Sequence, residues 1–169
     1  PILLSLALAL LMVGCGGFES EDNDPMEKLI LEGITPSKKA DKNFSMLQRD
    51  AMKIAIGFDK LDWRGKGDLR LLYLEAKGTP YTGWAKLMHI NGQVKELAQY
   101  KGGQPSGILT KWYKNGQKEE EAIYRDGKLM SAVAWKPNGE KCPVTNVKDG
   151  NGVAVYYNED GMESARLTY

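Results

Sequence analysis

Residues 107–127, GILTKWYKNGQKEEEAIYRDG, decide the fold of this 169-residue chain. At their centre stand Asn115 and Gly116, a pair typical of the tight turn that joins two antiparallel strands. The residues on either side include β-branched and aromatic side chains, which favour strands. This stretch is therefore expected to form one β-hairpin.

The same hairpin pattern occurs four times. Successive turn glycines are 24, 23 and 22 residues apart, and the repeats cover about residues 83–104, 107–128, 130–150 and 152–169. A period of this length marks an array of identical units, each too small to bury its own apolar face and therefore stacked on its neighbours. The turn pairs are Asn91 with Gly92, Asn115 with Gly116, Asn138 with Gly139, and Asp160 with Gly161.

Each turn is predicted to be a two-residue type I′ loop, because Asn and Gly tolerate the positive φ that both central residues need. Large side chains also recur, five positions after the start of each repeat and eight after most turn glycines. They should stack into ladders that form core rather than a ligand site. We therefore expect a mainly β fold, an elongated array of stacked β-hairpins over residues 69–169. The ladder residues are Met88, Trp112, Trp135 and Tyr157, with Tyr100, Tyr124 and Tyr169.

The N-terminal residues indicate export. Residues 2–13 form an apolar run interrupted only by Ser5, shorter than the roughly 20 residues that span a bilayer as a helix. A secretion signal over residues 1–14 is the better interpretation. Residues 11–15, LMVGC, resemble a bacterial lipobox, whose cysteine is acylated and becomes the new N-terminus. The resemblance implies a lipid on Cys15, and an ordinary cysteine after a cleaved signal is the alternative.

A lipid on Cys15 implies attachment to the cell envelope. Gly16 occupies the position where aspartate signals retention in an inner membrane, so the outer membrane is expected if the cell has two membranes. The protein would then face the periplasm or the exterior. Residues 15–24 are expected to form an acidic, solvated tether. The chain opens at Pro1 without a basic n-region, so we expect the signal to be truncated.

Residues 25–68 are predicted to form a helical and irregular segment. A short helix is expected over residues 25–33, where Asp24 and Glu27 suit a capping box. Five apolar side chains further on share one face of a second helix, which Ser45 and Gln48 can cap. That face should pack on the sheet, and a partner-docking helix is the alternative. The five residues are Phe44, Leu47, Ala51, Ile54 and Phe58.

The full pattern of residues 107–127, with opening glycine, aromatic pair, Asn-Gly turn, glutamate and tyrosine, resembles the MORN-repeat variant of bacterial YwqK-type antitoxins. The resemblance covers roughly residues 59–169 and implies a repeat scaffold, while the family name implies neutralisation of a toxic protein. The third repeat departs most, because Pro137 precedes its turn and Pro143 interrupts its outgoing strand. We therefore place the candidate binding surface there, at Trp135, Lys136, Lys141 and Cys142.

Charge and motifs argue against several functions. The chain carries 23 Lys and Arg against 22 Asp and Glu without a basic stripe, which disfavours a nucleic-acid partner. The single histidine, His89, takes the repeat position of Tyr113 and is expected to be exposed or half-exposed. Glu119, Glu120 and Glu121 should form a charged, solvated strand. Nucleophile motifs, phosphate loops and metal-ligand spacings are absent, so neither an enzyme nor a cofactor is expected.

These patterns favour a non-enzymatic, lipid-anchored repeat protein that binds another protein or serves as a scaffold at the cell envelope. The family resemblance implies an antitoxin-like or immunity-like role. Cell-wall polysaccharide or peptidoglycan is the alternative partner, because aromatic strand faces can stack on sugar rings. Membrane contact is expected only through the lipid.

Overall fold

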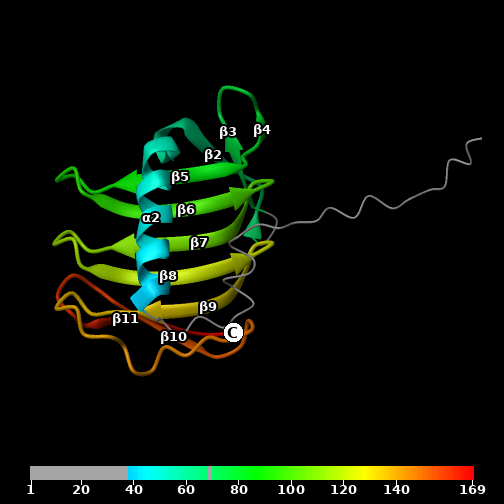
Figure 1. Cartoon of the computed structure of the whole chain (residues 1–169). Helices are drawn as coiled ribbons and strands as arrows, with labels where there is room; N and C mark the ends of the chain where they lie inside the picture. Colours follow the sequence, from blue (N-terminus) through cyan, green and yellow to red (C-terminus); the bar gives the residue numbers. More distant parts are fainter. Residues whose placement is uncertain (1–37, 68–69) are drawn as a thin grey trace, which may run out of the picture.

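The computed structural model describes residues 38–67 and 70–169 (Figure 1). The signal, Cys15, the tether and the helix expected over residues 25–33 lie outside the described residues. Within them the fold is mainly β, as predicted. The elements are α2 (Lys38–Ile54), β1 (Ile56–Gly57), the 3-10 helix η1 (Phe58–Lys60), β2 (Leu61–Arg64), β3 (Leu71–Leu74), β4 (Thr79–Pro80), β5 (Gly83–Met88), β6 (Val94–Lys101), β7 (Gln104–Trp112), β8 (Lys118–Arg125), β9 (Lys128–Ala134), β10 (Val153–Tyr157) and β11 (Glu163–Thr168).

One six-stranded sheet, in the order β1-β5-β6-β7-β8-β9, carries the first two hairpins and the opening strand of the third. Strands β5 to β9 follow one another antiparallel, and only the short β1 pairs parallel, through Ile56 with Ala85 and Gly57 with Lys86. Two smaller sheets, β2-β3-β4 and β10-β11, complete the β structure.

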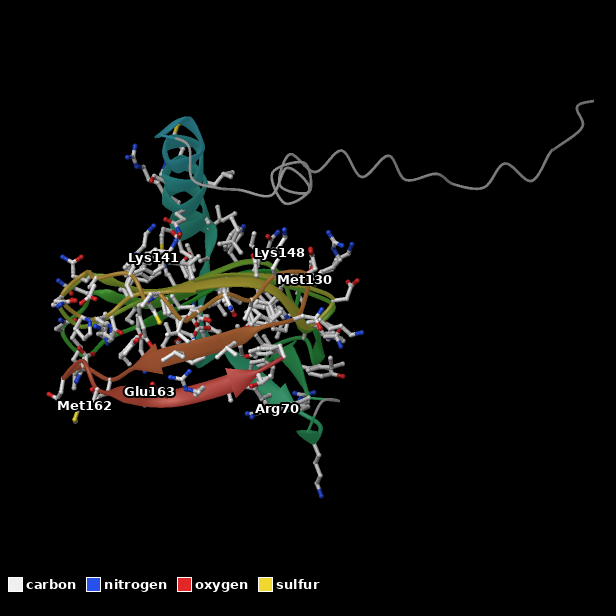
Figure 2. All side chains as sticks on the ribbon, turned by 90° about the horizontal axis from the view of Figure 1, so that it is seen from below. Arg70, Met130, Lys141, Lys148, Met162 and Glu163 are labelled. Atoms are coloured by element: carbon white, nitrogen blue, oxygen red, sulfur yellow. The ribbon has the colours of Figure 1, made fainter. Side chains whose placement is uncertain are left out.

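The two faces of the six-stranded sheet are covered differently. Leu97 and Ala98 are neighbours in β6 and point to opposite faces, yet both are buried. Leu97 packs with Ala51 and Ala55 at the helix, whereas Ala98 belongs to the main core with Leu72 of β3 and Ala154 of β10. Helix α2 therefore covers one face, and the two small sheets cover the other (Figures 1 and 2).

The four predicted turns lie at the predicted residues, but their type was predicted wrongly. In the first, Gly92 N–H donates to His89 O at 2.9 Å and His89 N–H donates to Gln93 O at 2.7 Å. Gly92 has φ of +81°, while Asn91 does not have a positive φ. This is the three-residue loop in which a left-handed glycine forms a bulge. Asn91 contributes its side-chain oxygen instead, which accepts from Gln93 N–H at 3.0 Å.

Two-residue loops with two positive φ values occur at the opposite ends of the strands. Arg125 pairs with Lys128 across Asp126 and Gly127, whose φ values are +48° and +79°. The connection between β6 and β7 has the same form, with two glycines. The type I′ geometry thus joins successive hairpins, where the strands of neighbouring repeats twist together.

The third repeat loses regular strand pairing after its turn, in the stretch that contains Pro143. Instead of a continuous ladder, the residues that follow the third turn form isolated bridges with the strand before it, Trp135 with Lys141 and Ser131 with Lys148. Thr145 Oγ1 then accepts from Val155 N–H at 3.0 Å and donates to Val155 O at 3.2 Å, so a side chain replaces a strand ladder. The fourth hairpin, β10-β11, lies against the sheet face opposite α2 (Figure 2).

The predicted ladders are not confirmed, because Tyr100 is the one buried member and its ring neighbours are residues outside the predicted ladders. Tyr100 is buried, with the rings of Phe58, Trp63 and Tyr81 at 6.1, 6.0 and 6.4 Å from its own. By contrast, Met88 and Tyr169 are exposed, and Trp112, Tyr124, Trp135 and Tyr157 are only half-buried.

The helix was predicted in roughly the right place with wrong details. It starts at Lys38, so Ser45 and Gln48 lie inside it and cannot cap its start. Phe58 lies beyond it in η1, and Ile54 is 70% exposed rather than packed. The face that meets the sheet is instead short and partly polar, with Ala51 buried and Gln48 donating to Thr110 Oγ1 at 2.8 Å.

Candidate binding surfaces

A groove of about 470 Å³ runs between α2 and the turns of the first two hairpins. Gln48 holds the helix over β7 through its bond to Thr110, and Lys86 Nζ donates to Met52 O at 3.1 Å from β5. These two contacts tie α2 to the sheet beside the groove. Its lining comes from α2 (Ser45, Gln48, Arg49, Met52) and from the hairpins (Gly92, Gln93, Val94, Trp112, Gly116).

The groove combines an apolar centre with a polar rim. Met52, Val94 and the half-buried Trp112 form the apolar part, and helix and turn side chains supply amide and guanidinium groups around it. Apart from Gly92 and its two chain neighbours, no residue has a heavy atom within 4 Å of where a Cβ on Gly92 would stand, so the turn does not fill its side of the groove. An apolar centre within a polar rim is typical of surfaces that bind polypeptides.

The predicted surface on the third hairpin is only partly a surface. Trp135 is half-buried, and Lys118 Nζ lies 5.5 Å from its ring centroid. Lys136 pairs with Glu140 at 3.0 Å, and Lys141 is exposed. These three predicted residues do share the third hairpin, since Trp135 bridges directly to Lys141.

Cys142 does not belong to that surface, because it is only 1% exposed. It packs with Ala134 and Val155, and the Tyr157 hydroxyl donates to its Sγ at 3.2 Å. Burial acts to raise the pKa of the thiol, but hydrogen bonds from Thr145 and Tyr157 outweigh burial and lower that pKa. The thiol is therefore an interior group, which corrects the surface prediction for this residue.

A row of charged side chains crosses the sheet, and Glu120, the member of the row that the Tyr156 hydroxyl of the fourth hairpin contacts, is buried, contrary to the expectation of a solvated strand. Glu96, Lys111 and Glu120 are consecutive cross-strand partners on β6, β7 and β8. Lys111 Nζ lies 2.8 Å from Glu120 Oε2, and the Glu120 side chain is 1% exposed. This ion-pair contact is the only polar contact of Oε2, which has no hydrogen-bond partner of good geometry among the described residues.

The environment of this row shifts two of its pKa values. Burial raises the pKa of Glu96, and the Glu120 carboxylate adds to this, although Lys111 opposes it. Burial alone would lower the pKa of Lys111, but the attraction of Glu120 and Glu96 raises it overall. The row therefore behaves as one coupled network inside a β layer.

His89 is buried rather than exposed, and it joins two hairpins. Its Nε2 lies 2.8 Å from Trp112 O, and Tyr113, at the same repeat position, donates to Trp135 O at 2.7 Å. The turn residues take part as well, since Asn91 Nδ2 donates to Lys114 O at 3.0 Å. The repeat alignment of His89 with Tyr113 was the signal that could have predicted this shared role.

Searches for a matching family model, for similar curated proteins and for similar solved structures found no match. In the described part of the chain, no three His, Cys, Asp or Glu side chains lie close enough together to hold a metal ion. No helix within residues 38–67 and 70–169 has the length and apolarity needed to cross a membrane.

Proposed function

We propose that this protein is a non-enzymatic module that binds another protein, with the groove beside α2 as its binding site. The observation that supports this most is the arrangement of Trp112, Met52 and Val94 inside a polar rim. Tryptophan seated in a partly desolvated pocket is the residue type that most often dominates the free energy of protein association.

The repeat scaffold supports the same function. In this proposal the hairpins form a MORN-type array, and the turns of neighbouring hairpins, Gly92 and Gly116, line one groove. A repeated backbone presents turn residues at regular intervals along a surface, which is how repeat proteins build extended binding sites. The third-hairpin surface, with Trp135, Lys136 and Lys141, would provide a second contact area.

The setting we propose is the cell envelope, with attachment through a lipid on Cys15, and the outer membrane in a two-membrane bacterium. This part rests on residues 11–15 and on the arithmetic of lipid burial, about 0.8 kcal/mol per buried methylene. An antitoxin-like or immunity-like role is the narrower form of the proposal. It rests on the repeat pattern of residues 107–127.

Cell-wall glycan is the second candidate ligand for the groove. Trp112 offers an aromatic ring, and Gln48 and Gln93 place amides that can donate to and accept from sugar hydroxyls beside it. The same residues therefore serve either ligand class, and the choice needs an experiment that reports the chemical nature of what is bound.

The test is a photo-crosslinking amino acid placed in the full chain in its native envelope, at Gln93 in the groove or at Lys128 as control. Lys128 is exposed at the other end of the strands. We expect one discrete protein adduct from position 93 alone, and its loss in a Trp112→Ala chain that keeps its circular dichroism spectrum. Identical adducts from both positions would rule out the groove, and a protease-resistant, muramidase-sensitive adduct would identify glycan.

A further inference from the structure

Two hydrogen bonds fasten each hairpin of the six-stranded sheet to the next. Between the first and second hairpins, His89 Nε2 lies 2.8 Å from Trp112 O and Asn91 Nδ2 donates to Lys114 O at 3.0 Å. Between the second and third, Tyr113 donates to Trp135 O at 2.7 Å and Asn115 Nδ2 to Pro137 O at 2.8 Å. The same positions act each time, so the junction is a repeated device: two side-chain donors meet two backbone acceptors.

The first hairpin displays an acceptor side that no side chain occupies. In the first hairpin, Met88 and Ile90 stand at the positions of the two acceptor residues, 24 positions before Trp112 and Lys114 of the second hairpin. Within the described residues, no side chain donates to either carbonyl. Strand β1 covers β5 only at Ala85 and Lys86 and stops short of this end.

The same place exposes apolar side chains. Met88 is 45% exposed and Ile90 is fully exposed. Neighbouring Leu87 is also exposed, and the segment has no charged residue. Repeat proteins ordinarily close their ends with a polar outer surface, and edge strands carry charges that discourage pairing. This end carries neither protection, so it has the properties of a docking edge.

The third hairpin displays one of the two donors of this junction, Asn138, because the other donor position is held by Lys136, which pairs with Glu140 at 3.0 Å. Asn138 Oδ1 accepts from Glu140 N–H at 3.0 Å, as in the other turns. Its Nδ2 donates to no group of the described residues, unlike the amides of Asn91 and Asn115. The reason is that the fourth hairpin leaves the sheet after Pro143 and pairs as β10-β11. Asn138 is exposed, so its amide is available to another molecule.

We infer that a second copy of this chain docks the turn of its third hairpin on the first hairpin, repeating between molecules the asparagine-to-carbonyl bond of the junction that already joins hairpins within one. Asn138 of one copy donates to the Ile90 carbonyl of the next, and the turn covers Leu87, Met88 and Ile90. The contact is heterologous, because two different surfaces meet, so association continues head to tail or closes into a ring. One turn is a small contact, and the association is correspondingly weak.

The test is sedimentation velocity on the full chain carrying Cys15→Ser, which removes any acyl contribution, from about 1 µM to about 1 mM protein. We expect the average mass to rise with concentration. Ile90→Lys blocks the acceptor end, and its side chain is fully exposed, so the fold should tolerate the change. Asn138→Asp blocks the donor end while keeping the oxygen that Glu140 N–H needs. Val144→Lys alters an exposed apolar residue elsewhere and serves as control.

Mixing the two blocked variants separates head-to-tail docking from every symmetric arrangement. Each variant alone should weaken association by at least about tenfold. Mixed in equal amounts, one supplies the intact donor and the other the intact acceptor, so dimers should form and grow no further. A monomeric wild-type chain at the highest concentration, association of Ile90→Lys equal to that of Val144→Lys, or a mixture that stays monomeric would each overturn the inference.

Discussion

Tyr156 in β10 donates its hydroxyl proton to Glu120 Oε1 in β8 at 2.9 Å, and this bond joins the fourth hairpin to the six-stranded sheet. The other oxygen of Glu120 lies 2.8 Å from Lys111 Nζ, and the Lys111 ammonium lies 5.8 Å from the Tyr156 ring centroid. A buried carboxylate is thus balanced by one cation and one hydroxyl donor. Removing either partner leaves charge that the interior cannot solvate.

Tyr156→Phe keeps the ring and removes only the donor. We expect it to lower the free energy of unfolding by about 1–3 kcal/mol, because Glu120 Oε1 is left buried without its partner. Urea denaturation followed by tryptophan fluorescence measures the change. Tyr157→Phe is the matched control, since its hydroxyl donates to the Cys142 sulfur, a weak acceptor. Equal midpoints for wild type and Tyr156→Phe would show that the bond contributes nothing.

Glu96 makes stability depend on pH in a definite direction. Its pKa is raised above the ordinary 4.5, chiefly by burial, so the folded state holds this proton more tightly than the unfolded chain. Stability is therefore greatest below the unfolded pKa and falls as the pH rises through the raised folded pKa. Glu96→Gln removes the titration, so the variant should gain stability relative to wild type as the pH increases over this window.

The measurement for Glu96 is the urea midpoint of both proteins between about pH 4 and pH 8. Glu75→Gln, at an exposed position, controls for the loss of one carboxylate. The prediction fails if the midpoints of wild type and Glu96→Gln stay a constant distance apart across this range.

The sequence was sufficient to locate the hairpins because turn signals are local. Asn91, Gly92 and their equivalents stand in the turns as predicted, but whether the loop has two or three residues depends on a bulge in the strand pairing. The burial of Glu120 depends on longer-range structure. The alternation of side chains along a strand shows which of them share a face. Only the return of the chain after Pro143 determines that β10 covers the face that carries Glu120.

The groove was not predictable from either segment that forms it. Arg49 and Met52 lie in the helix and Trp112 lies in β7, about 60 residues later, and neither stretch carries a motif for binding. His89 shows the same limit in a milder form. Its alignment with Tyr113 indicated a shared position, but burial and the carbonyl acceptor depend on the neighbouring hairpin.

His89 should therefore be replaceable by the residue of the next repeat. His89→Ala removes the bond to Trp112 O and leaves that carbonyl without its side-chain donor, for an expected loss of about 1–2 kcal/mol. His89→Tyr copies the second hairpin, where the Tyr113 hydroxyl reaches the equivalent carbonyl at 2.7 Å, and should recover most of the loss. Urea denaturation of the three proteins gives both differences. If His89→Tyr is as unstable as His89→Ala, the two junctions are not equivalent.

Gly103 and Gly102, adjacent in the loop between β6 and β7, should differ sharply in their tolerance of alanine. Both have positive φ, +84° and +57°. A Cβ on Gly103 would stand 2.8 Å from Leu72 O, where the β2-β3-β4 sheet meets the loop, whereas nothing lies within 4 Å of one on Gly102. Leu72 N–H also donates to Gly103 O at 2.8 Å, so the backbone there cannot withdraw without losing that bond.

We expect Gly103→Ala to lower the free energy of unfolding by about 1–3 kcal/mol more than Gly102→Ala, since overpacking adds to the same φ strain. Urea midpoints of the two variants test this, and equal values would mean that the small sheet moves aside freely.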